Sequence, residues 1–435
     1  MSSKTPSEVA GTAGATVTPA AAARGTGALL LTAAGAGVAG AVFLHGLDVV
    51  TGLQRAHPWL LAMLPVLGVA GAWLYRQADP AALGGTRLLI QQSRVPAGRP
   101  PFAMAPLILV TTLLTHLGGG SAGREGTALQ MGGGWAAGVM RWLRLPPRAA
   151  TWLLPAGMAA GFAAVFGTPW AAAVFAMEVV RTREGWWRRL VGSLACAWVG
   201  HGVAMGCGAR HAVLKLSLPS ALGEPRWLAT AAGCGVAMGL LARCFLVAMD
   251  RAQRVVGRLP AWWMGPVVGG ALVGLAAWAT GERGFLGLGM EPMDGGDPSI
   301  IGCLRGDAIA PWAWAAKLAF TVATLATGFR GGEVTPLFFM GATAGHAWGH
   351  ATGAPSSLMA AAGMASLFAA ASRAPWACGI MGWELFGPGA LPWVAVACGA
   401  SVVSAPRDGL YGLPGPKRRG GKEMTTSPVR PQGEE

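Results

Sequence analysis

The sequence predicts an all-α protein that crosses a membrane many times and is built from two related halves with broken and re-entrant helices. Its 435 residues are 53% hydrophobic and only 12% charged, with 68 glycines and a mean hydropathy of +0.47. These values are typical of a polytopic helical membrane protein and exclude an ordinary soluble globule. Enrichment in glycine and tryptophan fits close helix packing and anchoring at the membrane interface.

Apolar segments recur along the whole chain. Several are shorter than the roughly 20 residues that a helix needs to span a bilayer, so we expect broken or re-entrant helices that are buried in protein or line a cavity. The segments lie at about 28–50, 59–75, 103–117, 127–143, 149–166, 169–181, 190–208, 228–249, 261–280, 311–327, 335–350, 356–371, 374–386 and 390–404.

The composition divides the chain into four parts. Residues 1–26 are rich in Ala, Thr, Ser and Gly, and we expect a disordered tail without a cleaved signal peptide. Residues 27–210 and 211–413 are expected to form the two halves of the transmembrane domain, and 414–435 a basic polar tail. The polar, glycine-rich stretch 281–306 is expected to be a connecting loop.

The charge lies mostly in loops and at the ends of the chain. A net charge of +14 with basic clusters at 141–148, 181–189 and 251–258 indicates a positive-inside bias and two cytoplasmic termini. Few aromatic residues accompany these charges, so we expect no nucleic-acid partner. The seven cysteines form no CxxC pair and lie mainly in apolar segments, so we expect no disulfide framework, metal site or cofactor.

Two segments of the chain match without a gap. Residues 157–178 and 363–384 both begin Gly-Met-Ala, carry Pro-Trp-Ala twelve residues after the first glycine, and end on a glutamate nine residues after the proline. Their offset of 206 residues (363 minus 157) is close to the 208 (333 minus 125) that separates Glu125 from Glu333. Duplicated halves with Gly- or Pro-broken helices are typical of transporters with a site at the midplane.

The glycine-rich segment 118–134 carries Arg124 and Glu125 within apolar surroundings. A charge at membrane depth costs a few kcal/mol or more, so it faces a cavity or has a partner. The apolar run from Thr127 predicts a helix that opens just after Glu125, which places backbone N–H groups and a carboxylate at an anion-binding helix start. The alternative is a buried glutamate paired with Arg124, which we disfavour because adjacent residues do not face each other on a helix.

A second segment, 328–341, repeats the order Arg, Gly, Glu, Thr before an apolar run. Pro336 suits the first turn of a helix, so Glu333 also marks a helix start. Thr335 and Thr127 offer hydroxyl donors near these starts, and Val334 offers a backbone N–H. The alternative is ordinary helix-start chemistry, since a glutamate or threonine there is stabilising without any ligand.

These motifs resemble the CLC family of anion channels and proton-coupled anion antiporters over roughly residues 28–413. The residues that carry the likeness are Gly123-Arg124-Glu125-Gly126, Gly-Gly-Glu-Val-Thr-Pro at 331–336, and the duplicated Gly-Met-Ala…Pro-Trp helices. The family's general pattern has Gly-Arg-Glu-Gly-Pro and Gly-x-Phe-x-Pro, whereas Arg-Glu-Gly-Thr and Gly-Gly-Glu-Val-Thr-Pro resemble its fluoride-exporting branch. Near 84–90 the chain also lacks the family's Gly-Ser-Gly-Ile-Pro.

The position of the proton-relay glutamate also differs from the family's general pattern and resembles the fluoride-exporting branch. Chloride/proton antiporters carry a relay glutamate directly after another glutamate, and here Val179 follows Glu178. The fluoride branch also lacks the relay glutamate, so the resemblance implies that Glu333 handles protons. It further implies a CLC-type inverted repeat, a homodimer with one path per subunit, and fluoride export coupled to protons across a prokaryotic-type plasma membrane.

The resemblance also assigns roles along the anion path. Glu125 is implied to be the gate, because its ionised carboxylate blocks the anion site and its protonated form swings away. Tyr411 is implied to donate its hydroxyl to the central anion. Tyr75 lies at the end of an early apolar segment, where we expect an interfacial anchor. Thr86 falls where the family keeps a central serine or, in the fluoride branch, a methionine.

Other functions remain open. A chloride/proton antiporter or passive chloride channel of the same family would keep the gate without depending on Glu333. An intramembrane enzyme would need a nucleophile–base pair or metal ligands, and Ser121 near His116 is the only candidate pair. His346 and His350 are spaced to bind a metal, but no Glu follows His346, and packing is the interpretation we favour.

Overall fold

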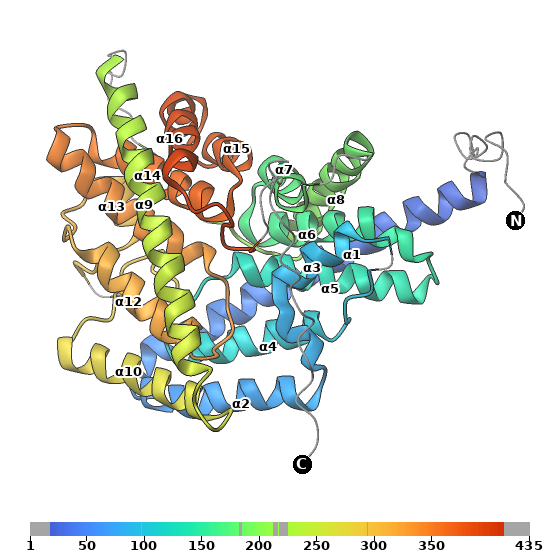
Figure 1. The fold of residues 1–435 in the computed structure, drawn as a ribbon, viewed down its shortest axis with the longest axis horizontal. Coiled ribbons are helices and arrows are strands. Elements are labelled where there is room, and N and C mark those ends of the chain that lie inside the picture. The colour runs from blue at the N-terminus through green and yellow to red at the C-terminus, as the bar shows by residue number, and fades with distance from the viewer. Residues whose placement is uncertain are drawn as a thin grey trace, which may run out of the picture.

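The computed structural model describes residues 18–96, 98–181, 185–211, 216, 225–293 and 295–412. These residues form sixteen α-helices and four short 3-10 helices, and their one β-bridge, between two glycines, belongs to no strand. The chain colours in Figure 1 show that the N-terminal and C-terminal parts form two adjoining groups of helices.

The first group contains eight α-helices. They are α1 (Pro19–Ala56), α2 (Leu64–Gln77), α3 (Gly85–Arg94), α4 (Met104–Leu117), α5 (Glu125–Trp142), α6 (Ala150–Phe166), α7 (Pro169–Val180) and α8 (Trp186–Gly206). The second group also contains eight. They are α9 (Pro225–Val256), α10 (Met264–Thr280), α11 (Ile300–Arg305), α12 (Ala313–Leu325), α13 (Val334–Thr352), α14 (Ser356–Ser372), α15 (Pro375–Phe386) and α16 (Leu391–Ser404).

The apolar segments lie where the structure has helices, with three differences. Helix α1 begins at Pro19, inside the segment expected to be a tail, because Thr18 caps an alanine-rich first turn that opens on proline. Helix α3 was not predicted, since its Arg, Gln and Ser residues interrupt the apolar pattern. Helix α11 lies inside the stretch 281–306 that was expected to be a loop, and Ser299 caps it. Residues 1–17 and 413–435 lie outside the described part of the chain.

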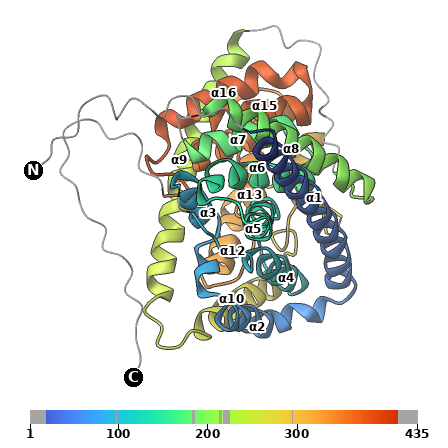
Figure 2. The ribbon, with the colours of Figure 1, turned by 90° about the vertical axis from the view of Figure 1, so that its right-hand side faces the viewer.

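The helix lengths agree with broken helices. Within the described residues, four helical stretches are long and apolar enough to cross a membrane: Pro19–Ala56, Pro58–Gln77, Pro147–Phe166 and Arg226–Val256. Six further apolar helices are only 10–17 residues long. Helices α5 and α13 lie in the interior of the bundle in Figure 2, whereas α1 and α9 run along its outside.

The duplicated segments form the same helix–turn–helix in both halves. Gly167 (φ 81°) ends α6 in the left-handed region before Pro169 opens α7. Arg373 (φ 59°) ends α14 in the same way before Pro375 opens α15. A left-handed residue stops a helix and a proline starts the next, so the local sequence alone produces these corners.

Glycines bring the helices of each half into backbone contact. A Cβ at Gly132 of α5 would lie 2.0 Å from the carbonyl oxygen of Gly157 of α6. A Cβ at Gly341 of α13 would lie 2.4 Å from the carbonyl oxygen of Gly363 of α14. Both distances exclude a side chain, so the same close packing of small residues recurs in the two halves.

Phenylalanine rings join the halves at the centre. Phe166 of α6 stacks on Phe338 of α13, and Phe175 of α7 stacks on Phe368 of α14, each pair with ring centroids 5.3 Å apart. Offset stacking of buried rings adds to the hydrophobic contribution of their burial. This cluster fixes the position of α13 relative to α6, and therefore the position of the two loops that precede α5 and α13.

Candidate functional site

Two glycine-rich loops from opposite halves pair at the centre of the bundle. The backbone N–H of Gly123 donates to the carbonyl of Gly332 at 2.6 Å, and that of Gly332 donates to Gly123 at 2.8 Å. A Cβ at Gly123 would lie 2.8 Å from the Thr335 hydroxyl, and one at Gly126 would lie 2.9 Å from the Gly332 Cα. Only glycine permits this approach.

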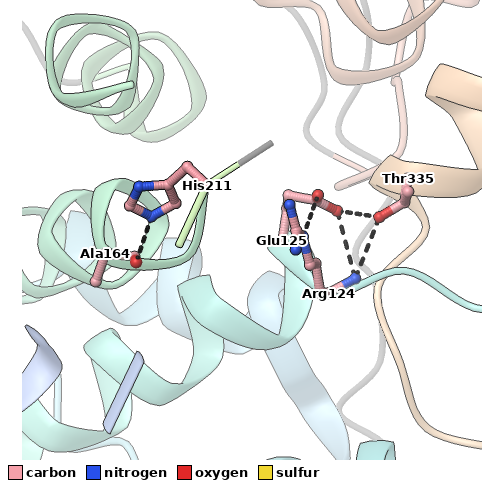
Figure 3. A network of polar contacts seen from close by, with 5 residues as sticks. All are labelled: Arg124, Glu125, Ala164, His211 and Thr335. Atoms are coloured by element: carbon pink, nitrogen blue, oxygen red, sulfur yellow. Dashed lines mark hydrogen bonds and ion pairs between the residues drawn. The ribbon is translucent and has the colours of Figure 1, made fainter. Parts of the chain in front are cut away.

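Glu125 is the first residue of α5, and its side chain is completely buried. The Thr335 hydroxyl donates to its Oε2, and the backbone N–H of Arg124 lies 3.3 Å from the same oxygen (Figure 3). The Arg124 Nε lies 3.4 Å from Glu125 Oε1. Our expectation that the side chains of Arg124 and Glu125 do not face each other was wrong. The expectation assumed that both residues are helical, but Arg124 precedes the helix, so its side chain can turn toward Glu125.

Glu333 directly precedes α13, as the sequence predicted. It is partly exposed to a cavity, and its Oε2 would lie 3.3 Å from a Cβ at Gly126. The paired loops therefore hold the two acidic helix starts, 208 residues apart in sequence, against each other.

Backbone donors converge at these helix starts. The N–H groups of Gly126, Thr127, Val334 and Thr335 donate to no acceptor among the residues that the structure describes. Free N–H groups and the positive ends of two helix dipoles favour an anion there. In the structure, Glu125 directly precedes Gly126 and Thr127, and its carboxylate also accepts the hydroxyl of Thr335 from the other helix start.

Two cavities approach the loop pair. The first, of about 580 Å³, is lined by Thr86, Glu333 and Tyr411. The second, of about 440 Å³, is lined by Arg124 together with His116 and His211. Glu125 lines neither cavity, although its neighbour Arg124 lines one and Glu333, across the loop pair, lines the other. Its carboxylate therefore lies in the barrier between them.

The remaining sequence-predicted residues divide into two groups. Thr86, near the start of α3, and the buried Tyr411 share the first cavity with Glu333. Val334 is fully buried beside Glu333. Thr127 is placed differently, because its hydroxyl pairs with that of Thr112 at 2.9 Å and takes no part in binding Glu125.

Tyr75 is not the interfacial anchor that we expected. Its side chain is only 1% exposed, and the Arg330 guanidinium lies 4.8 Å from its ring centroid. Arg330 itself lines the first cavity. A cation over an aromatic face is held there electrostatically, so Tyr75 positions a positive charge at the cavity wall.

A buried lysine also escaped the sequence analysis. Lys317 of α12 is completely buried, and its Nζ donates to the carbonyl oxygens of Phe285 at 3.0 Å and Gly287 at 2.8 Å. Gly287 lines the second cavity. A lone basic residue in the apolar segment 311–327 was the available signal, as it was for Arg330, because a charge at membrane depth needs a partner or a cavity.

The nucleophile–base pair that the enzyme interpretation would need, Ser121 with His116, does not form. The Ser121 hydroxyl pairs with that of Thr321 at 3.1 Å, and neither ring nitrogen of His116 has a hydrogen-bond partner among the described residues. His346 and His350 lie edge to face with ring centroids 4.6 Å apart. Within the same residues, no group of three or more His, Cys, Asp or Glu side chains could hold a metal ion.

Sequence comparison gives a consistent picture. Residues 66–405 match the family described as voltage gated chloride channel. A chloride/fluoride channel protein of Pseudomonas syringae pv. tomato is 37% identical over 375 residues, which cover 85% of this chain and 82% of that protein. The H(+)/Cl(-) exchange transporter ClcA of Cronobacter sakazakii is 30% identical over 349 residues, covering 74% of this chain and 72% of that one.

Solved structures agree with this picture. The crystal structure of a CLC-type fluoride/proton antiporter superimposes with a TM-score of 0.84 and 28% identity, over 92% of this chain and 99% of that one. A slow cyanobacterial Cl-/H+ antiporter superimposes with a TM-score of 0.71 at 19% identity, over 87% of this chain and 94% of that one. At that identity the second likeness concerns the fold alone.

Proposed function

The chain belongs to the voltage gated chloride channel family, and from this premise we propose that it is a secondary transporter, not an enzyme, that exchanges fluoride for protons. The proposal rests on one observation above all: the Glu125 carboxylate occupies the barrier between two cavities, at a helix start with unused backbone N–H groups. An ionised carboxylate there occupies the place of the anion.

Protonation of Glu125 opens the barrier. A neutral carboxyl group loses its attraction to the helix N-terminus and to Arg124, so it can leave the site. The free donors of Gly126, Thr127, Val334 and Thr335 then attract an anion from either cavity. One proton on Glu125 therefore exchanges with one negative charge in the barrier, which couples the two movements.

Glu333 is proposed to carry protons on the side of the first cavity. It is partly exposed there, next to the Gly126 backbone, and thus within a short path of Glu125. Glu178 is unsuited to this role, because its carboxylate accepts the backbone N–H groups of Trp376 at 3.3 Å and Ala377 at 2.7 Å. Val179 beside it cannot carry a proton.

Fluoride is the anion we propose. Threonine hydroxyls and backbone N–H groups are strong donors that suit a small, hard acceptor, and Thr335 stands at the gate itself. The Pseudomonas protein is named for chloride and fluoride, and the structure with TM-score 0.84 is a fluoride/proton antiporter. Chloride remains the second candidate, because the relative from Cronobacter is named as an H(+)/Cl(-) exchanger.

A homodimer in a cell membrane, with both termini cytoplasmic, completes the proposal. Large apolar side chains are exposed on the outer surface of α7, α15 and α16. They include Trp376 (76% exposed) on α15 and Val403 (81% exposed) on α16. A surface of this kind suits lipid or a second copy of the chain. The basic residues Lys417, Arg418, Arg419 and Lys422 after the last apolar segment support a cytoplasmic C-terminus.

Reconstitution into liposomes tests the function. With fluoride, chloride and pH measured in parallel, fluoride efflux should drive proton uptake, and Glu125→Gln should abolish that coupling. Glu384→Gln is the matched control, because Glu384 is a glutamate that lines neither cavity. Equal transport of chloride and fluoride would defeat the fluoride assignment, and intact coupling in Glu125→Gln would defeat the gate.

A further inference from the structure

A third cavity lies away from the anion pathway, at the C-terminal end of α5. It has a volume of about 700 Å³ and lies between the end of α5 and the segment that precedes α4. Three arginines line it, and Asp79 is the one acidic residue among its lining side chains. The charge of its wall is therefore strongly positive.

The three arginines are Arg99, Arg141 and Arg144. Their side chains are exposed, and none of them forms a hydrogen bond or ion pair with any residue that the structure describes. Asp79 forms no ion pair with them, and its Oδ1 accepts the backbone N–H of Ala81 at 2.9 Å. Three guanidinium groups around one cavity without an anionic partner leave strong, directional donors unused.

Local backbone geometry holds two of these arginines together. The N–H of Leu145 donates to the carbonyl of Met140 at 2.9 Å, and Arg144 takes a left-handed conformation (φ 47°). This is the turn that ends helices, and it normally favours glycine at the position of Arg144. It brings Arg144 back beside the last turn of α5, which contains Arg141.

The rest of the cavity wall is apolar. Pro100 and Pro101 form one side, and Ala137, Met140 and Leu145 form the other. A soluble anion would leave this surface unused. A ligand with a phosphate group and a hydrocarbon portion would contact both parts of the wall.

An aromatic cluster on the other side of α5 places the cavity at a membrane interface. Phe102, Trp135 and Trp142 lie with ring centroids 5.3–6.0 Å apart, and Trp142 is 58% exposed. Tryptophans gather at the level of the lipid headgroups. The basic cluster 141–148, at the end of α5 and in the loop after it, is also expected on the cytoplasmic side, where the leaflet carries anionic lipids.

We propose that the cleft formed by Arg99, Arg141, Arg144 and the adjoining proline and α5 surfaces binds the headgroup of an anionic phospholipid. The phosphodiester accepts hydrogen bonds from the guanidinium groups, and the glycerol and upper acyl chains lie on Pro100, Pro101 and Met140. The lipid occupies the end of α5 opposite to Glu125. The inference does not depend on which anion the protein carries.

Native mass spectrometry of the purified full chain in detergent tests this site. We expect phosphatidylglycerol to bind at least ~10-fold more tightly than phosphatidylcholine, since charge-assisted hydrogen bonds to two or more arginines distinguish the net anionic lipid. Arg141→Gln with Arg144→Gln should remove most of that preference, and the corresponding lysine pair should keep part of it.

Arg251→Gln with Arg258→Gln is the matched control. These arginines are also exposed and lie outside the cleft, Arg251 near the end of α9 and Arg258 just after that helix, and the pair carries the same change of charge. An equal loss in the control would overturn the site in favour of general surface charge. Unchanged preference in the cleft variant would overturn it directly, and displacement of the lipid by millimolar inorganic phosphate would assign the cleft to soluble anions instead.

Discussion

Two pairs of glutamates lie beside helix starts, and the two pairs differ in what surrounds them. Glu178 and Glu384 each lie beside the first turn of a helix from the other half, whereas Glu125 and Glu333 stand at the starts of their own helices. Glu178 accepts the first N–H groups of α15, and Glu384 accepts those of α7 from Trp170 at 3.0 Å and Ala171 at 2.8 Å. Each carboxylate thus satisfies the other half's helix. This pair is closed, because the carboxylates accept the first free backbone N–H groups of both helices.

The Glu125–Glu333 pair is open. Each of these glutamates stands at the start of its own helix, and the N–H groups of Val334 and Thr335 remain unused. Glu125 binds Thr335, whereas Glu333 faces a cavity. Acidic residues at helix starts are therefore structural where they cap a partner helix, and available for transport where free donors and cavities surround them.

Among substitutions that test the difference between the two glutamate pairs, we expect Glu333→Gln to have the largest effect on transport. Glu333→Gln removes the one ionisable group that we assign to proton movement from the first cavity, so proton uptake driven by fluoride efflux should fall to the leak of empty liposomes. Fluoride efflux itself should persist. Continued proton uptake in this variant would return the chain to the alternative in which only Glu125 matters.

A steric change at the loop pair should have the next largest effect. Gly126→Ala places a Cβ 2.9 Å from the Gly332 Cα, which forces the two loops apart. Overpacking of this kind lowers stability by about 1–3 kcal/mol, and the displaced loops should misplace the Glu125 carboxylate, so fluoride flux should fall by ~10-fold or more. Gly27→Ala is the control, because nothing lies within 4 Å of its Cβ. Normal flux in Gly126→Ala would show that the loop contact is dispensable.

Thr335→Val should have a smaller effect. It removes the hydroxyl that donates to Glu125 while keeping the shape of the side chain. A hydrogen bond to a charged group contributes about 1.5–3 kcal/mol. The rate of fluoride/proton exchange should therefore fall by about 10-fold. Thr127→Val should change exchange less, since that hydroxyl pairs with Thr112. The reverse order in the flux assay would mean that Thr127 is the threonine at the gate.

Substitution in the closed pair, Glu178 and Glu384, should have the smallest effect on transport. Glu384→Ala leaves the N–H groups of Trp170 and Ala171 without their acceptor, and should lower the free energy of unfolding by about 1–2 kcal/mol. Thermal unfolding in detergent measures this loss. The ratio of protons to fluoride should not change, and a changed ratio would place Glu384 within the transport machinery.

The family and the all-α fold were predicted from the sequence and are confirmed, because their signals are local. Runs of apolar residues, prolines at helix starts, and left-handed residues at helix ends act within one or two turns of the chain. The same signals located Glu125 and Glu333 at the starts of α5 and α13. Helix α3 was missed for a local reason as well, since its amphipathic pattern differs from an apolar segment.

The roles of individual side chains were decided by tertiary structure. The sequence offered Thr127 and Thr335 as equals, and only the fold places Thr335 on Glu125 and Thr127 on Thr112. The partnership of Arg330 with Tyr75 was also invisible, because the two residues are far apart in the chain.

The sequence by itself determined where the helices begin and end, that the chain is duplicated, and which two acidic residues stand at helix starts within apolar surroundings. The tertiary structure decided which of the repeated glutamates are closed by a partner and which are open to a cavity. The physical reason is the distance along the chain over which each interaction acts. Capping and hydrophobic patterning act between neighbours in sequence, whereas hydrogen bonds near 3 Å between residues about 200 positions apart, such as Glu178 with Ala377, exist only after the two halves have packed.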